Sequence, residues 1–221
     1  MFLVIEGLDG AGKSTQVKLL RNYLKEKGIE TEYIHFPRFD APFYGELVAR
    51  YLRGDFGGLD DVDPYIVAVL YAGDRSDASK NIERWLDEGK YVIVDRYVYS
   101  NIAYQCAKIE DSMQREKLRR WIFDLEYGNN KIIRPTLSIF LDVPFKFTTQ
   151  SLTNEREGDD RLYLEGKSDI HEASLTFQEK VRKCYLDQAT LDNTFKIVDC
   201  SDAQGNMLPS KDIFDRIVKF I

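Results

Sequence analysis

A glycine-rich segment near the start of the chain has the residue types and spacing to bind a polyphosphate. Residues 7–14, GLDGAGKS, fit the pattern G-x-x-x-x-G-K-[ST] in full. Glycines let such a loop wrap so that its backbone N–H groups point at a phosphate, and a helix that begins near Lys13 adds its positive end. The segment therefore predicts a site for ATP phosphates and Mg²⁺, held by Gly7, Asp9, Gly10, Ala11, Gly12, Lys13, Ser14 and Thr15.

Charged residues that follow two apolar runs suggest what else this site binds. Asp95 ends the run Val92–Asp95. Phosphoryl-transfer enzymes have a carboxylate at the end of a buried strand that helps to hold Mg²⁺, so Asp95 is expected to bind Mg²⁺ together with Ser14. Arg96 follows Asp95 directly, and Arg38 follows the predicted strand at 31–36. Two arginines near a phosphate loop indicate that the acceptor is itself a phosphate. The segment 130–133, NKII, lacks the aspartate of the guanine-reading N-K-x-D pattern, which argues against a GTPase.

The elements that must position these residues alternate between strand and helix. Apolar runs separated by amphipathic stretches predict parallel βαβ units, and therefore an α/β fold with a five-stranded parallel sheet flanked by helices on both faces. Ligands bind such sheets at the carboxyl ends of the strands, where the charged residues lie. We expect one domain over 1–221, with strands at 2–5, 31–36, 91–94, 137–141 and 195–198, and helices at 13–27, 64–87, 98–108, 112–126, from 144, 169–193 and 211–221.

Composition excludes several classes of protein. The 221 residues carry a net charge of −6, which disfavours nonspecific binding to nucleic acid or to an anionic membrane. The longest apolar run, 65–72, is too short to span a bilayer, and Met1–Ile5 lacks the basic leader of a signal peptide. Three cysteines without paired spacing predict free thiols in the cytoplasm, and only two histidines disfavour a histidine-based metal site.

Five segments together resemble the thymidylate kinases, across about residues 1–190. Residues 5–15 (IEGLDGAGKST) resemble the opening of these enzymes, and 95–105 (DRYVYSNIAYQ) resembles their DRY-x-x-S-x-x-A-Y segment. Residues 36–38 (FPR), 134–135 (RP) and 141–144 (LDVP) also fit. The resemblance implies a P-loop kinase fold and transfer of the ATP γ-phosphate to dTMP, giving dTDP and ADP. A phosphate monoester is largely ionised at pH 7, so this reaction needs no strong general base.

The resemblance also implies roles for individual residues. Catalysis falls to Lys13, Asp95, Arg96 and a lid arginine. Arg38 and Arg96 would clamp the phosphate of dTMP, and Asp9 would meet its 3′-hydroxyl. The remaining acceptor residues are Tyr71 (stacking on the base), Arg75 (thymine O4), Asn101 (the ring edge), Tyr104 (excluding a ribose 2′-hydroxyl), and Ser100 and Gln105 behind them.

A charged stretch after the fourth strand resembles the mobile lid of nucleotide kinases. We expect this lid at about 153–166, closing over ATP to exclude water. The phosphate loop contains no arginine, so the resemblance implies that Arg156 or Arg161 stabilises the transition state, with Arg156 the first choice. His171, further on, either approaches the acceptor or is structural.

Some alternatives stay open. The helix at 64–87 is apolar on more than one face, which fits either a deeply buried helix or a homodimer interface. Another pyrimidine nucleotide or deoxynucleoside kinase of the same fold is a competing function. A non-catalytic ATP-binding regulator is a third, although the intact Lys13, Ser14 and Asp95 argue against it.

Overall fold

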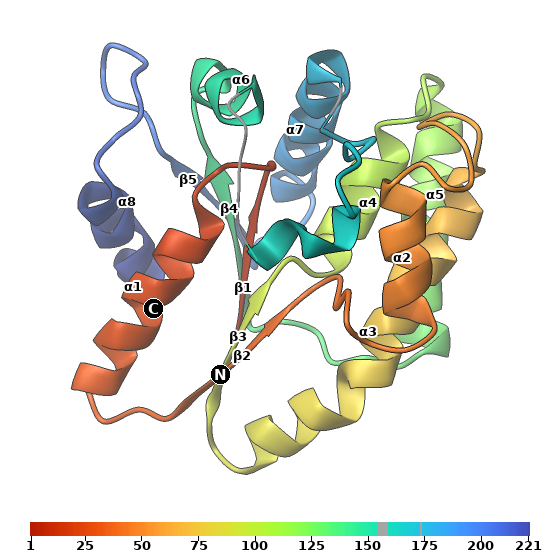
Figure 1. Ribbon diagram of the computed structural model, residues 1–221. Coiled ribbons are helices and arrows are strands. Elements are labelled where there is room, and N and C mark those ends of the chain that lie inside the picture. The colour runs from red at the N-terminus through yellow and green to blue at the C-terminus, as the bar shows by residue number, and fades with distance from the viewer. Residues whose placement is uncertain (154–158, 173) are drawn as a thin grey trace.

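The computed structural model describes residues 1–153, 159–172 and 174–221, and it contains a five-stranded parallel sheet (Figure 1). The strand order is β2-β3-β1-β4-β5, and every neighbouring pair is parallel, which confirms the predicted sheet. The strands are β1 (Phe2–Gly7), β2 (Thr31–His35), β3 (Tyr91–Asp95), β4 (Leu137–Asp142) and β5 (Phe195–Asp199).

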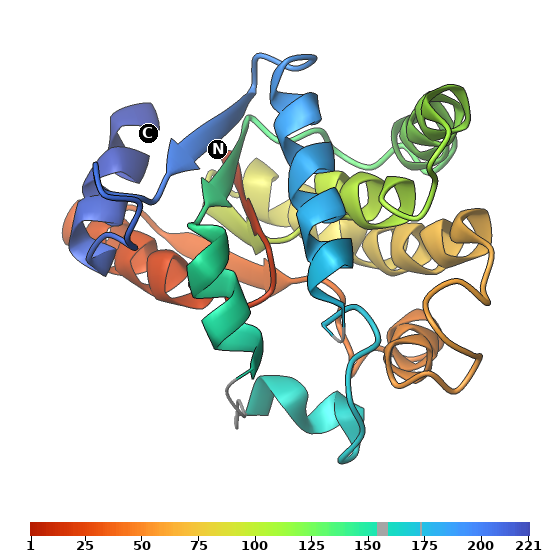
Figure 2. The ribbon, with the colours of Figure 1, turned by 90° about the horizontal axis from the view of Figure 1, so that it is seen from above.

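Helices cover both faces of the sheet, as Figure 2 shows from above. One face packs against α1 and α8, and the other against α3, α4, α5 and α7. Alternate residues of the central strands enter the two cores, so these strands are mostly apolar on both faces. The helices are α1 (Lys13–Glu26), α2 (Tyr44–Leu52), α3 (Pro64–Asp87), α4 (Val98–Cys106), α5 (Ser112–Phe123), α6 (Phe145–Thr153), α7 (Leu175–Ala189) and α8 (Ser210–Ile217).

Short helical segments of other types complete the chain. A π-helix, η1 (Asp124–Asn129), continues α5, and 3₁₀ helices η2 (Asp159–Leu164) and η3 (Val218–Phe220) follow α6 and α8. Within the described ranges, no helix is both long and apolar enough to cross a membrane. The three cysteines, Cys106, Cys184 and Cys200, are buried and free, as predicted.

The structure corrects the prediction of one long helix at 169–193. The helix α7 begins at Leu175, because the Ser174 side chain caps it by accepting a hydrogen bond from the backbone N–H of Phe177 at 3.2 Å. Before that cap, the Asp169 carboxylate accepts from the backbone N–H of His171 at 2.7 Å. This turn directs residues 169–172 toward the carboxyl ends of the strands instead of along a helix.

Candidate active site

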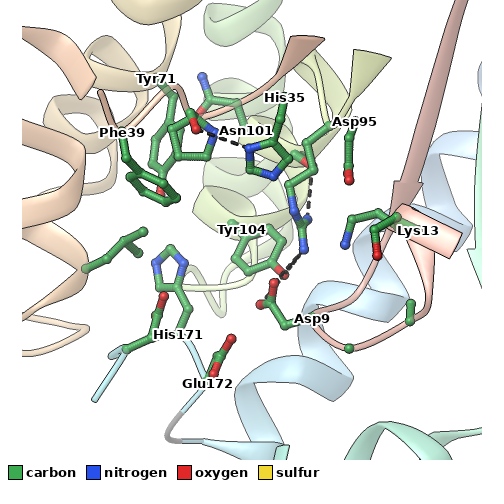
Figure 3. Close-up of a pocket in the computed structure, with 18 of the residues that line it drawn as sticks. Asp9, Lys13, His35, Phe39, Tyr71, Asp95, Asn101, Tyr104, His171 and Glu172 are labelled. Carbon is green, nitrogen blue, oxygen red and sulfur yellow. Dashed lines mark hydrogen bonds and ion pairs between the residues drawn. The ribbon is translucent and has the colours of Figure 1, made fainter. Parts of the chain in front are cut away.

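A cavity of about 660 Å³ lies at the carboxyl ends of β1, β2 and β3. Its walls are the glycine-rich loop, the segments that follow β2 and β3, helices α3 and α4, and residues from 163 to 172 (Figure 3). The sequence places the predicted phosphate and acceptor residues at this edge of the sheet, and the structure brings most of them onto one cavity.

The glycine-rich loop depends on glycine for its shape. Gly10 and Gly12 have φ values of 74° and 78°, in the left-handed region that side-chain-bearing residues avoid. A Cβ atom on Gly7 would stand 3.2 Å from the Cβ of Ala11 and 3.3 Å from the Cγ of Lys13. The loop therefore closes tightly around the buried Lys13, whose Nζ donates to the carbonyl of Leu8 at 3.1 Å.

Most of the predicted loop residues reach the cavity. Those that line it are Asp9, Gly10, Ala11, Gly12, Lys13 and Ser14. Gly7 and Thr15 do not line it, because Gly7 is the last residue of β1 and Thr15 is exposed in the first turn of α1.

Two oxygen-bearing side chains on the cavity suit a divalent cation. Asp95 ends β3 and is 4% exposed, and its Oδ1 has no hydrogen-bond partner among the described residues. Ser14, also on the cavity wall, is exposed. Within the described ranges, no group of three or more His, Cys, Asp or Glu side chains could hold a metal ion. Asp95 and Ser14 carry oxygen donors of the kind that Mg²⁺ prefers, and Mg²⁺ is commonly held by one or two carboxylates together with phosphate oxygens.

Arg96, Asp9 and Tyr104 form one hydrogen-bonded cluster on the cavity wall. Arg96 Nη2 donates to Asp9 Oδ1 at 2.6 Å, and the Tyr104 hydroxyl donates to Asp9 Oδ2 at 2.7 Å. Burial alone would raise the pKa of Asp9, but the charges of Arg96 and Lys13 hold that pKa well below its usual range. Asp9 is thus a fixed carboxylate that accepts, and the cluster presents a guanidinium to any anion in the cavity.

Glu6 lies beneath this cluster, and no role for it was predicted from the sequence. It is fully buried at the end of β1 and accepts from Ser100 Oγ at 2.5 Å, from the Tyr185 hydroxyl at 3.0 Å and from the backbone N–H of Tyr97 at 2.9 Å. Burial raises the pKa of Glu6 despite these bonds and the nearby Arg96. The one available signal was a glutamate inside an otherwise apolar strand.

The opposite end of the cavity carries uncharged polar groups. Tyr71 comes from α3, and Asn101 and Gln105 come from successive turns of α4. Gln105 is fully buried, and neither atom of its amide has a partner among the described residues. This end suits an aromatic, hydrogen-bonding ring, while the Arg96 end suits a phosphate.

Two predicted acceptor residues, Arg38 and Arg75, do not line the cavity. Arg75 is 1% exposed and pairs with both carboxylate oxygens of Glu126, because a buried guanidinium requires a compensating charge. Arg38 lies on the loop after β2, where its Nε donates to Asp74 at 2.8 Å and its Nη2 to Asp77 at 2.6 Å. The carboxylates that hold both arginines were not identified from the sequence.

Residues 163–172 close the cavity from the side of the predicted lid. Tyr163 stacks on Phe39, with ring centroids 3.7 Å apart and planes at 10°, and its hydroxyl donates to Asp169 at 2.7 Å. Burial and the nearby Asp9 raise the pKa of Asp169 to about 7.

His171 is buried on the wall of the cavity, which is the region where the sequence predicts the acceptor. Its ring lies 5.0 Å from that of Tyr104, and its Nε2 is 3.3 Å from the Tyr51 hydroxyl. Burial, then the charge of Lys108, lowers the pKa of His171 to about 3, so the ring is neutral at pH 7.

The structure describes little of the two predicted lid arginines, Arg156 and Arg161. Arg156 is outside the described residues. The backbone of Arg161 belongs to η2, and its side chain is outside the description.

The comparisons with known proteins point to one family. A family model described as thymidylate kinase matches residues 5–207. A probable thymidylate kinase of Thermococcus kodakarensis is 34% identical over 207 residues, covering 91% of this chain and 90% of the relative. The thymidylate kinase of Fervidobacterium nodosum is 32% identical and covers 90% of each chain. A solved thymidylate kinase structure from Candida albicans has a TM-score of 0.74 and 26% identity, and the match covers 100% of this chain and 90% of that chain.

Proposed function

The chain belongs to the thymidylate kinase family and is a nucleoside monophosphate kinase that phosphorylates dTMP; from that premise we propose how its residues carry out the transfer. The donor is ATP, whose phosphates occupy the glycine-rich loop, with Lys13 neutralising the outer phosphates. The acceptor is dTMP, which lies along the cavity from Arg96 to Asn101 and Gln105. The one catalytic domain spans 1–221.

Arg96 binds the acceptor phosphate in this proposal. Its guanidinium is already held in place by Asp9 and Tyr104, so little side-chain entropy is lost when the phosphate binds. Arg38 is the second phosphate contact, exchanging the exposed Asp77 for the phosphate. Because the attacking oxygen is already ionised at pH 7, alignment and charge neutralisation supply the catalysis.

Asp9 and Tyr104 read the sugar. Asp9 is an acceptor-only carboxylate beside the phosphate site, and it suits the 3′-hydroxyl of a deoxyribose. The Tyr104 ring, packed between Arg96 and His171, limits the room for a 2′-hydroxyl. Tyr71 stacks on the base, and Ser100 supports Arg96 through its hydrogen bond at 3.2 Å.

Ser14 and Asp95 are the residues that would hold Mg²⁺. The buried Oδ1 of Asp95 without a partner among the described residues supports this assignment. Mg²⁺ bound there would supply positive charge that neutralises the phosphates. We assign the transition-state arginine to the lid, with Arg161 and Arg156 as the two candidates.

We also infer a homodimer in the cytoplasm. Three free thiols suit a reducing compartment, which supports the cytoplasmic location.

An exposed apolar face on α3 supports the homodimer. Ile66 is 58% exposed and Val69 is 40% exposed, and a second copy of the chain would cover both side chains. An Ile66→Glu variant is expected to sediment as a monomer while the wild type sediments as a dimer.

One observation supports this proposal most strongly: the glycine-rich loop and the cluster of Arg96, Asp9 and Tyr104 line the same cavity. The test is release of ADP from ATP and Mg²⁺ with dTMP, dUMP, UMP, dCMP, AMP, GMP or thymidine as acceptor. Rapid turnover with dTMP and weaker turnover with dUMP are expected. Lys13→Met should abolish turnover, while Lys18→Met, an exposed lysine on the same helix, should not. Turnover with thymidine and none with dTMP would refute the acceptor site.

A further inference from the structure

A second hollow, of about 870 Å³, is lined by α1 and β2 and lies beside the active-site cavity. Three exposed cations of α1, Lys18, Arg21 and Lys25, stand on its wall. Their spacing of three and four residues puts them on one face of the helix, along about 10 Å of its length. Residues 28–33 and Lys90 also line this α1–β2 groove.

The three cations of α1 have no carboxylate partner among the described residues. Lys90, on the same groove, pairs with Glu32 at 2.8 Å and with Glu88 at 2.9 Å. Arg21 instead lies over the ring of Tyr33, with its guanidinium carbon 5.7 Å from the ring centroid. Four cations and two carboxylates line the groove, so it has an excess of positive charge in a chain whose net charge is −6. The groove therefore attracts an anionic ligand.

An open strand edge also lines the groove. β2 is the outermost strand of the sheet and pairs only with β3. The Glu30 carbonyl accepts from the first residue of β3 at 2.9 Å, and the Phe36 N–H donates to the last residue of β3 at 3.0 Å. Alternate residues of a parallel strand bond to the same neighbour, so Thr31 and Tyr33 direct their backbone groups away from β3. Neither their N–H nor their C=O groups have a hydrogen-bond partner among the described residues.

We propose that the α1–β2 groove binds an extended, acidic segment of another protein, which adds to the sheet as a strand beside β2. The backbone of this segment pairs with Thr31 and Tyr33. Its acidic side chains, which recur about 6.7 Å apart at alternate positions of a strand, meet the three cations along α1. The backbone bonds supply affinity, and the cations select an acidic sequence.

A free polyphosphate is the competing occupant, because Ser14 and Tyr33 line both this groove and the active-site cavity. A polyphosphate offers hydrogen-bond acceptors only, so the open carbonyls of Thr31 and Tyr33 would face further oxygens and stay unpaired. A peptide backbone supplies donors and acceptors together at the spacing of a strand. The open edge of β2 therefore favours the peptide.

The first test measures the binding of a fluorescein-labelled peptide of alternating glutamate and valine to the whole chain. Fluorescence anisotropy would be recorded at about 20 mM salt, where charges are weakly screened. The wild type should bind the peptide saturably. The variant Lys18→Gln/Arg21→Gln/Lys25→Gln should bind it at least about 10-fold more weakly, because three exposed ion pairs are lost together. All three side chains are exposed, so the variant should fold as the wild type does.

The matched control removes the same charge from exposed cations of α3 and α5, as Lys80→Gln/Arg84→Gln/Arg120→Gln. It should keep the affinity of the wild type for the peptide. An equal loss of affinity in both variants would mean that only the net charge of the chain matters, and it would overturn the proposal. No saturable binding by the wild type up to about 1 mM peptide would also overturn it.

A second test asks whether the peptide pairs with β2 as a strand. Two versions of it, N-methylated at every glutamate or at every valine, each remove the N–H groups along one edge of the strand. At least one version should lose binding, because the edge that faces Thr31 and Tyr33 needs its donors. Binding of both versions with the affinity of the unmodified peptide would overturn the proposal. Displacement of the labelled peptide by inorganic tripolyphosphate at lower concentrations than by the unlabelled peptide would assign the groove to phosphates instead.

Discussion

Two neighbouring residues of the cavity wall should change the stability of the protein with pH in opposite directions. Burial lowers the pKa of His171 to about 3, from 6.5 in the unfolded chain, and raises the pKa of Asp169 to about 7, from 3.8. Between pH 6.5 and 3, the unfolded state therefore binds a proton at His171 that the native state does not. Over nearly the same window, the native state binds a proton at Asp169 that the unfolded state does not.

The magnitudes follow from linkage. Each pH unit across such a window is worth about 1.4 kcal/mol, so lowering the pH from 7 to 4 costs about 3 kcal/mol through His171. The same change stabilises the native state by about 3 kcal/mol through Asp169. In the wild type the two effects nearly cancel. His171→Gln should therefore gain about 3 kcal/mol relative to the wild type between pH 7 and pH 4, and Asp169→Asn should lose about as much.

Urea denaturation measures this directly. Unfolding of each protein would be followed by tryptophan fluorescence at pH 4, 5, 6 and 7, and only the difference from the wild type would be interpreted, because other titrating groups cancel in it. A difference in unfolding free energy that is the same at all four pH values reflects lost hydrogen bonds and carries no information on protonation. If the His171→Gln curve runs parallel to the wild-type curve, within about 0.5 kcal/mol at all four pH values, the assignment of a buried neutral histidine is refuted.

Three further experiments test the cavity. Arg96→Ala should abolish phosphoryl transfer and leave the affinity for ATP nearly unchanged, because its partners belong to the acceptor side; an equal loss of ATP affinity, measured by calorimetry, would contradict that role. Tyr104→Ala should lower the preference for dUMP over UMP, measured as a ratio of kcat/KM values, by making room for a 2′-hydroxyl. Phe39→Ala and Tyr163→Ala should show a coupling free energy of about 1 kcal/mol in a double-mutant cycle of urea denaturation, and additive effects would mean that the stack contributes nothing.

The sequence predicted the framework of the fold well because its signals are local. Each central strand is a largely apolar run that only a sheet covered on both faces can bury. The glycine-rich loop is also a local pattern. The helix expected at 169–193 was wrong at its start, since the turn that Asp169 makes with His171 depends on one side chain-to-backbone bond. The helix α2 was not predicted.

The candidate site was predicted less completely, because pairing partners are distant in sequence. Arg75 was expected to face the base, but Glu126, 51 residues away, holds it in the core. Neither Glu6 nor Glu126 was identified, since an isolated glutamate in an apolar stretch does not reveal its future donors. Residue type and spacing located the cavity, and tertiary contacts determined which side chains reach it.

The hydrogen bonds that join β1 and the glycine-rich loop to α7 have a consequence for biosynthesis. Gln178 donates to Asp9 across 169 residues of sequence, and Tyr185 donates to Glu6 across 179. Contacts that close loops of this length form late and slow folding. The glycine-rich loop leaves the ribosome first, yet its carboxylate has all of its partners only when α7 docks. A chain halted before α7 would contain the complete nucleotide-binding motif without the contacts from α7 that fix its geometry. Nucleotide affinity should therefore appear only at the end of folding.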